Sequence, residues 1–202
     1  MYEWRQASPD ERRRILHERR LKGQPWHSPP HIDGPTNLYH ICVACYEHKP
    51  YIGTTLERLQ EFSSTLLVTL AELAAEIFTW CILPNHYHVQ LRLDGGVKNF
   101  IKELGKFHGG TSFRWNGEEN CRGRKIWCNT IDRWIRDERH FWTALNYIHH
   151  NPVKHGLVQK WQEWPFSSAR DYLNRVGKEK AREIWFACPV KDYGSDWLGT
   201  DL

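Results

Sequence analysis

The hydrophobic pattern of this chain alternates between two periods. Short segments rich in β-branched and aromatic residues predict strands, and longer segments with apolar residues three or four apart predict helices. The predicted strands are residues 38–46, 77–83, 86–93 and 126–128, and the predicted helices are residues 55–75, 97–115 and 137–148. Pro152 disfavours the helical conformation at Asn151, so we expect the last of these helices to end there.

The order of these elements predicts an α+β fold. Strand, helix, strand, strand, helix, strand and a terminal helix is the order of a ferredoxin-like split βαβ unit, an antiparallel sheet with helices on one face. We find no internal repeat. The chain is predicted to contain a basic extension and linker (residues 1–36), a main domain (37–173) and a C-terminal tail (174–202). The Arg-rich stretch of the extension is either a solvated helix face or a phosphate clamp, and both interpretations stay open.

Composition narrows the class of protein only slightly. The chain has 202 residues, a formal charge of +4 and a hydrophobic content of 40%, which together indicate a folded and mildly basic protein. No apolar run approaches the ~18 residues that a membrane helix needs. The N-terminus is charged and lacks the apolar region of a signal peptide, so we expect a cytoplasmic protein without a membrane partner. Some of the eleven tryptophans could offer stacking platforms for unpaired bases, although most should be core.

Cys42 and Cys45 form a C-x-x-C pair that raises the possibility of a zinc site with Cys121 and Cys128. The flanking residues predict a strand, and residues three apart on a strand face opposite sides of the sheet. The second pair is also too widely spaced for a tight zinc knuckle. We therefore interpret these cysteines as buried or incidental thiols.

Two short segments carry the candidate chemistry. His86 and His88 are two apart in a predicted strand, so both imidazoles should point to the same face, an arrangement that suits a divalent metal. Tyr147 and Asn151 are four apart in a predicted helix and should share one of its faces. A metal that faces a phenol is the minimal equipment for attack on a phosphodiester. Taken singly, each residue could be structural, and no catalytic role is assigned to His149, His150 or His155.

These segments resemble a known family. The string CILPNHYHVQL resembles the His-hydrophobe-His motif of HUH single-strand nucleases. The string beginning IDRWIRDERHFW and continuing through NYIHHNPVKHGLV to WPFSSARDYL resembles the C-terminal signature of IS200-like Y1 transposases, in particular their REP-associated tyrosine transposase branch. The resemblance covers roughly residues 37–173.

The resemblance implies a ferredoxin-like fold and cleavage and joining of single-stranded or hairpin-flanked DNA through one tyrosine. It implies Tyr147 as the nucleophile and His86, His88 and Asn151 as ligands of Mg²⁺ or Mn²⁺. An isolated phenol titrates near pH ~10 and needs help to attack, which a metal on the scissile phosphate would supply. The product would be a 5′-phosphotyrosine and a free 3′-hydroxyl. Relatives of this fold work as monomers or as homodimers, and both states stay open.

Basic residues near the site complete the expectations. The predicted DNA-binding residues are Arg114, Arg122, Arg124, Lys125 and Lys154. Two alternatives to the transposase-like enzyme stay open. One is a host-adopted protein that grips hairpin nucleic acid without strand transfer, and the other is a metal-dependent phosphoesterase that activates water instead of Tyr147.

Overall fold

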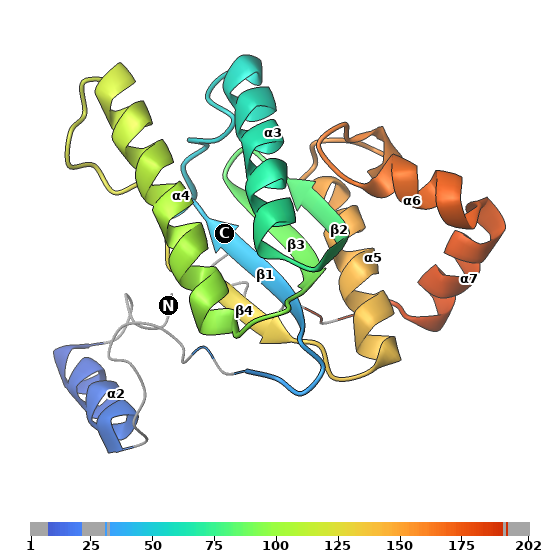
Figure 1. Cartoon of the computed structure of the whole chain (residues 1–202), viewed down its shortest axis with the longest axis horizontal. Helices are drawn as coiled ribbons and strands as arrows, with labels where there is room; N and C mark the ends of the chain where they lie inside the picture. The colour runs from blue at the N-terminus through green and yellow to red at the C-terminus, as the bar shows by residue number, and fades with distance from the viewer. Residues whose placement is uncertain (1–7, 22–30, 32, 192, 194–202) are drawn as a thin grey trace.

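The computed structural model describes residues 8–21, 31, 33–191 and 193 of the chain. In this part of the chain, four strands form one antiparallel sheet in the order β2-β3-β1-β4 (Figure 1). The strands are β1 (Leu38–Ala44), β2 (Glu76–Ile82), β3 (His86–Arg92) and β4 (Ile131–Trp134). With helices between β1 and β2 and between β3 and β4, this is the split βαβ arrangement, so the predicted α+β fold is confirmed.

Some of the helices begin at residues whose side chains cap them. The bounds of the helices are α2 (Pro9–Leu21), α3 (Leu56–Leu73), α4 (Val97–Glu118), α5 (Glu138–Lys154), α6 (Ala169–Val176) and α7 (Lys178–Ala187), with short 3₁₀ turns η1 (Tyr46–His48) and η2 (Trp161–Glu163). Ser8 and Glu11 form a reciprocal capping box at the start of α2. Thr55 accepts a hydrogen bond from the backbone N–H of Arg58 and caps α3.

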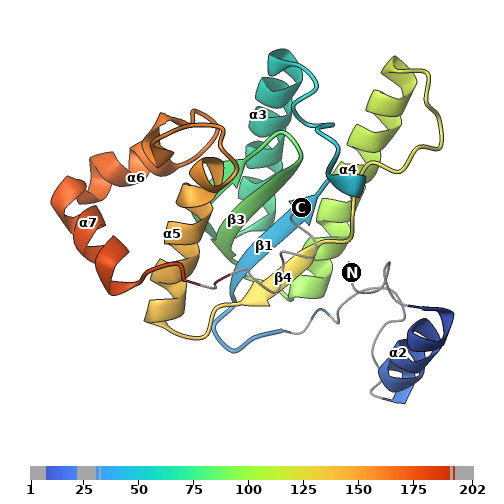
Figure 2. The same cartoon turned by 180° about the vertical axis from the view of Figure 1, so that it is seen from behind.

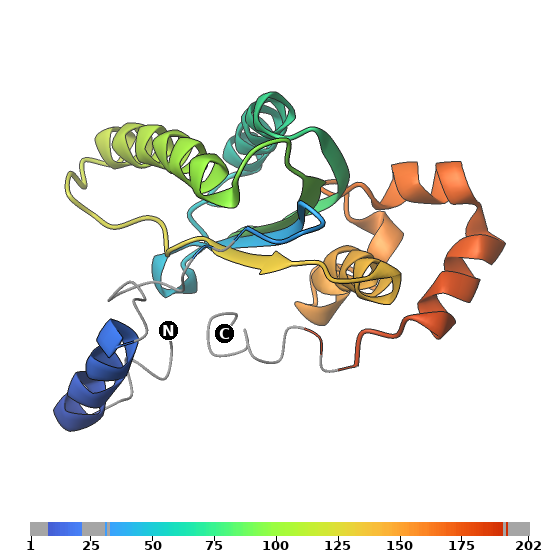
Figure 3. The same cartoon turned by 60° about the horizontal axis from the view of Figure 1, so that its bottom comes forward.

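The sheet has two buried faces of different character. Tyr39, Ile41 and Val43 of β1 point into the main core, which lies under α3 and α4. The alternate residues, His40 and Cys42, point to the opposite face, where α5 packs (Figure 3). The prediction of helices on one face therefore holds for α3 and α4 but was wrong for α5. Helical periodicity shows that a helix is amphipathic, but it does not show which side of a sheet the helix covers.

The fourth strand was predicted at the wrong place. Residues 126–128 do not form a strand of the sheet: Trp127 makes a single bridge to Cys45, and the regular pairing with β1 begins at Ile131. Ile126 and Trp127 are apolar residues of the main core, and their burial explains the apolar pattern that predicts a strand there. A short buried loop segment and a short strand cannot be distinguished by hydrophobicity alone.

The end of α5 also differs from the prediction. The helix continues through Pro152 to Lys154, and its C-cap is His155. Gly156, the next residue, has a φ of +68°, the left-handed conformation common just after a helix C-cap. The N–H of Leu157 donates to the carbonyl of Pro152 over 2.9 Å, which closes the last turn. A proline in the last turn removes only one backbone hydrogen bond, so the helix tolerates it there.

The C-terminal segment contributes further helices. The predicted boundary at residue 173 falls inside α6, and α7 contacts both α5 and α6 (Figure 2). Among the described residues, no helix is both long and apolar enough to cross a bilayer. Cys42 and Cys45 belong to the cores on opposite faces of the sheet, and none of the six cysteines, all of which lie in the described part of the chain, forms a disulfide.

One histidine of the main core should make stability depend on pH. His108 of α4 is buried, and its Nε2 lies 2.9 Å from the hydroxyl of Tyr87. Burial lowers the pKa of His108 from 6.5 to about 3. The folded state therefore holds this ring neutral at a pH at which the unfolded chain protonates it. The unfolded state then binds more protons, so stability is lost as the pH falls from about 6.5 towards 3.

We expect the His108→Gln variant, which keeps a partner for Tyr87, to lose less stability on acidification than the wild type. The difference should approach ~1 kcal/mol between about pH 6 and about pH 5, because one proton is linked to unfolding. Urea unfolding of both proteins at each pH measures it. Equal losses would show that His108 is not held neutral by the fold.

Candidate active site

The predicted histidines, amide and phenol converge between β3 and α5. His86 Nε2 lies 2.9 Å from Asn151 Oδ1. The rings of His88 and Tyr147 meet edge to face with centroids 5.3 Å apart, and the rings of His86 and His88 are 5.0 Å apart. The structure thus brings the two pairs together, each sharing one face of its strand or helix. Their chemical roles stay predictions.

Asn85 and Asn151 face the two nitrogens of His86. The amide Nδ2 of Asn85 donates to the carbonyl of His48 over 3.1 Å, so its Oδ1 faces His86 Nδ1 at 2.7 Å. A neutral imidazole has one N–H, so either Nε2–H donates to Asn151 or Nδ1–H donates to Asn85, and metal binding through Nε2 requires the hydrogen on Nδ1. The lone pair of His86 then lies on Nε2, the atom that faces Asn151.

His40 is a site residue that sequence reasoning missed. It points from β1 to the same face as His88, and its Nε2 lies 3.1 Å from His88 Nδ1. When His88 Nδ1–H donates to His40, the lone pair of His88 lies on Nε2. His40 Nδ1–H can then donate to the hydroxyl of Tyr193, 2.9 Å away. A lone histidine in an otherwise apolar strand was the available signal, but only the pairing of β1 with β3 gives it a partner.

All the histidines of this cluster are held neutral. Burial is the largest cause in each case: it lowers the pKa of His86 to about 3 and the pKa of both His40 and His88 well below the usual value. The ring of His155 packs edge to face on His86, and its pKa is also lowered by burial. Neutral imidazoles are the form that binds a metal.

The donor set fits a divalent cation. Two nitrogens with bonds of ~2.1 Å to one octahedral ion lie ~3 Å apart when they are neighbours, and the same holds for a nitrogen and an oxygen. His86 Nε2 and Asn151 Oδ1 are 2.9 Å apart, and the Nδ2 of Asn151 has no hydrogen-bond partner among the described residues. His86, His88 and Asn151 are therefore able to hold Mg²⁺ or Mn²⁺ with water or phosphate oxygens. No group of three His, Cys, Asp or Glu residues suited to a metal occurs in the described part of the chain, and the set of possible ligands here includes an amide.

Tyr147 is buried beside a lysine. It is 2% exposed, and Val190 and Tyr193 of the C-terminal segment pack against its cluster. Lys154 Nζ lies 3.5 Å from its phenolic oxygen. The ammonium group can stabilise negative charge on that oxygen or on a phosphate. A DNA strand reaches Tyr147 only when the residues that cover it move aside.

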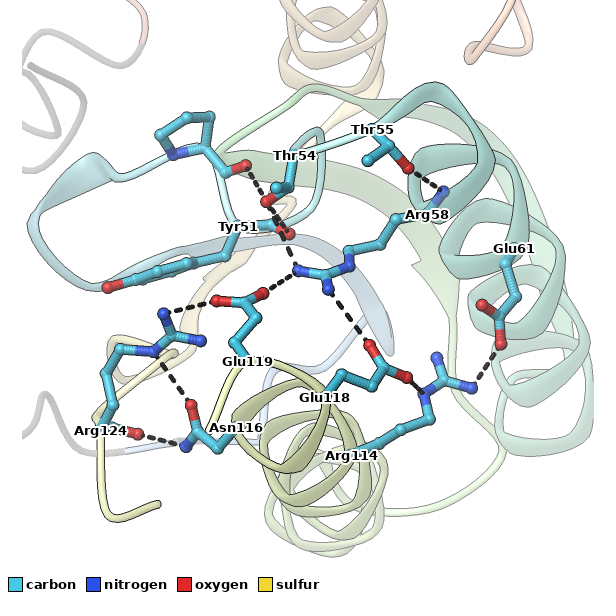
Figure 4. A network of polar contacts seen from close by, with 11 residues as sticks. Tyr51, Thr54, Thr55, Arg58, Glu61, Arg114, Asn116, Glu118, Glu119 and Arg124 are labelled. Atoms are coloured by element: carbon cyan, nitrogen blue, oxygen red, sulfur yellow. Dashed lines mark hydrogen bonds and ion pairs between the residues drawn. The ribbon is translucent and has the colours of Figure 1, made fainter. Parts of the chain in front are cut away.

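Three of the predicted DNA-binding residues lie away from this cluster, around the C-terminal end of α4: Arg114, Arg122 and Arg124. Figure 4 shows Arg114 and Arg124. Arg114 contacts Glu61 and Glu118, and Arg124 pairs with Glu119 over 2.7 Å. Arg58 joins Glu118 and Glu119 and so links α3 to this network. The carboxylates offset much of the positive charge of Arg114 and Arg124. These two arginines are therefore weaker candidates for contacts with DNA phosphates.

Arg122 and Lys125 differ from that pair. The guanidinium of Arg122 stacks over Phe113 at 4.2 Å. Lys125 Nζ lies 4.7 Å from the ring of Tyr46, just beyond the end of β1 at which Ala44 pairs with His86. Of the five predicted DNA-binding residues, Lys154 and Lys125 therefore lie on the side of the site where His86 lies.

Two histidines of α5, His149 and His150, point elsewhere. His149 Nε2 lies 2.7 Å from Thr79 Oγ1 and 2.9 Å from Ser168 Oγ, at the β2 side of the helix. His150 packs against Trp185 of α7.

Comparison with known proteins supports the resemblance. A Haemophilus influenzae protein provisionally named as a REP-associated tyrosine transposase is 29% identical over 54% of this chain and 68% of its own length. The REP-associated tyrosine transposase of Escherichia coli is 33% identical over 46% of this chain and 53% of its own length. No protein-family model matches the chain.

A solved structure of a REP-associated tyrosine transposase bound to a REP hairpin has a similar fold. The TM-score is 0.55 with 22% sequence identity, and the match covers 74% of this chain and 85% of that one. The chain spans only about half the length of the Escherichia coli relative, so activity and partners are argued below from its own residues.

Proposed function

We propose that this chain, a relative of the REP-associated tyrosine transposases, cleaves and rejoins single-stranded DNA next to hairpins through Tyr147 with the help of Mg²⁺ or Mn²⁺. The observation that carries the proposal is the convergence of His86, His88 and Asn151 beside Tyr147 on one face of the sheet. The names of the relatives supply the reaction class, and the hairpin bound by the structural neighbour supplies the substrate class.

The proposed chemistry is one phosphoryl transfer, from the 3′ oxygen of the DNA to the phenolic oxygen of Tyr147. The phenolic oxygen of Tyr147 attacks the scissile phosphorus and loses its proton, while the bond from phosphorus to the 3′ oxygen breaks and that oxygen takes up a proton. The products are a 5′-phosphotyrosine and a free 3′-hydroxyl. Because the new ester conserves the bond energy, the 3′-hydroxyl of another strand can reverse the step without ATP.

Each residue of the site has a defined task. A divalent cation held by His86, His88 and Asn151 would neutralise charge on the phosphate oxygens and orient the phosphate for in-line attack. Lys154 is placed to stabilise charge on the phenolic oxygen. His40 holds His88 in the orientation and tautomer that leave a lone pair for the metal.

The burial of Tyr147 favours one alternative function. With the phenol 2% exposed, the chain in this conformation could bind a hairpin without forming a covalent adduct. A host-adopted binding protein would behave in this way. The adduct assay described below separates the two functions.

The first prediction concerns the metal. We expect the His86→Ala and Asn151→Ala variants each to weaken Mn²⁺ binding roughly tenfold or more, because each removes a ligand, and loss of a supporting residue alone typically costs ~10–100-fold. Electron paramagnetic resonance of free Mn²⁺ measures the affinity. His108→Gln, on the other face of the sheet, is the matched control and should bind Mn²⁺ as the wild type does. Wild-type affinity in both ligand variants would place the metal elsewhere.

The second prediction concerns the nucleophile. Labelled hairpin DNA with a single-stranded flank, mixed with protein and Mn²⁺, should give a labelled protein band that survives a denaturing gel. Tyr147→Phe should give no such band while its DNA affinity stays within about twofold, because only one oxygen is removed. Tyr193→Phe, whose ring lies 5.3 Å from that of Tyr147, should still form the adduct. An adduct that forms in Tyr147→Phe but not in Tyr193→Phe would assign the nucleophile to Tyr193. Cleavage without an adduct would indicate a phosphoesterase.

The third prediction concerns the DNA path. Neutralising Lys125 and Lys154 together (K125Q, K154Q) should reduce the slope of log affinity against log salt by about 1–2, since each phosphate contact contributes ~0.7–0.9. Lys106→Gln is the control, because Lys106 lies on α4 and pairs with Glu103. A loss of slope for Arg114→Gln as large as that for the double variant would instead place the DNA along α4.

A further inference from the structure

A pocket lies on the side of α5 away from the histidine cluster. It has a volume of about 450 Å³ and is lined by residues of α5, η2, α6 and α7, three helices and a turn that gather at one end of the molecule (Figures 1 and 2). This is the size of a small-molecule site, typically ~300–1,000 Å³. The proposed strand-transfer chemistry makes no use of it.

The walls of this pocket are aromatic. Trp161 stacks on the ring of His149, with centroids 5.5 Å apart and planes 15° from parallel. Trp185 packs against His150, and Tyr172 lies behind His149 with ring centroids 5.2 Å apart. Flat aromatic faces of this kind stack on planar ligands, and base-on-aromatic stacking is worth ~1–3 kcal/mol per base.

Polar atoms without partners are also built into these walls. His149 and Tyr172 are 3% and 4% exposed, yet His149 Nδ1 and the Tyr172 hydroxyl have no hydrogen-bond partner among the described residues. His149 cannot turn away, because Thr79 and Ser168 hold its other nitrogen. Burial lowers the pKa of His149 to about 3, so the ring is neutral. Buried polar groups left unpaired cost stability, and a ligand with a polar edge would satisfy them.

The rim of the pocket is basic. Lys178 and Arg182 line it, and the guanidinium of Arg182 lies 5.6 Å from the ring of Phe186, which is 68% exposed. Among the described lining residues there is no carboxylate. The pocket therefore combines a stacking surface, two lining side chains with unpaired polar atoms and positive charge at its mouth, the three features that recognise a base, its edge and its phosphate.

We propose that this pocket binds one unpaired DNA base, stacked on the aromatic wall and hydrogen-bonded to His149 and Tyr172, with its phosphate next to Lys178 and Arg182. The proposal rests on the proposed function only for the identity of the polymer as DNA. Asn146 and His150, which line the pocket, flank Tyr147 on α5. A bound base would thus lie about one helix diameter (~10 Å) from the phenol, close enough to hold the strand during cleavage.

The test uses the four deoxynucleoside monophosphates as probes, with deoxyribose 5-phosphate as the probe that lacks a base. Binding is followed by saturation-transfer NMR on the full chain in the Tyr147→Phe background with a chelator, so that neither the nucleophile nor a metal can retain the probe. At least one nucleotide should bind at millimolar concentration and more tightly than deoxyribose 5-phosphate. Equal binding of all five probes, or no binding of any nucleotide, would overturn the proposal.

Two variants locate the binding. Trp185→Ala should weaken nucleotide binding about fivefold or more, the equivalent of ~1 kcal/mol of stacking. Tyr172→Phe should weaken it several-fold while the melting temperature stays the same or rises, because the removed hydroxyl has no partner to lose among the described residues. The control is Phe113→Ala, which removes an exposed aromatic side chain of α4 that pairs with the guanidinium of Arg122 in the following loop.

The outcomes of this test and of the adduct assay are independent. Nucleotide binding that survives both Trp185→Ala and Tyr172→Phe would overturn the pocket proposal even if Tyr147 forms an adduct. Nucleotide binding that is lost in these variants but kept in Phe113→Ala would support the pocket even if no adduct forms and the proposed function fails.

Discussion

The pairing of β1 with β3 is the constraint on which the rest of this structure depends. Because side chains alternate along both strands, one register sends Ile41, Val43 and Val89 to the core under α3 and α4 and sends His40 and His88 to the other face. A shift of one residue would bury the imidazoles in the apolar core. The hydrophobic pattern that stabilises the sheet therefore also fixes the direction of the site histidines.

Burial of so many imidazoles in one place has a chemical consequence. Their pKa values are lowered mainly by desolvation, so the imidazoles of the cluster remain uncharged. Each neutral ring can donate only one hydrogen bond and accepts at its other nitrogen. The contacts among Asn85, His86, His40 and His88 distribute these hydrogens so that a lone pair of each proposed ligand can face the metal. The same neutrality avoids repulsion of a cation.

Helix α5 connects the two sites that we propose. One of its sides carries Tyr147 and Asn151 towards the sheet, and another carries His149 and His150 into the aromatic pocket between α6 and α7. A rigid helix with one function on each side can fix the distance between a held base and the nucleophile. This arrangement gives the helices after residue 168 a part in the site, although the sequence suggested only a tail beyond residue 173.

The sequence by itself determined the elements with strong periodicity, the split βαβ order and the shared face within each pair, His86 with His88 and Tyr147 with Asn151, because spacing within one strand or helix fixes which residues share a face. Only the tertiary structure decided which face of the sheet α5 covers, where β4 pairs and that His40 meets His88. It also decided that Arg114 and Arg124 face carboxylates. These features depend on contacts between residues far apart in the chain, and local patterns of hydrophobicity and charge carry no record of such contacts.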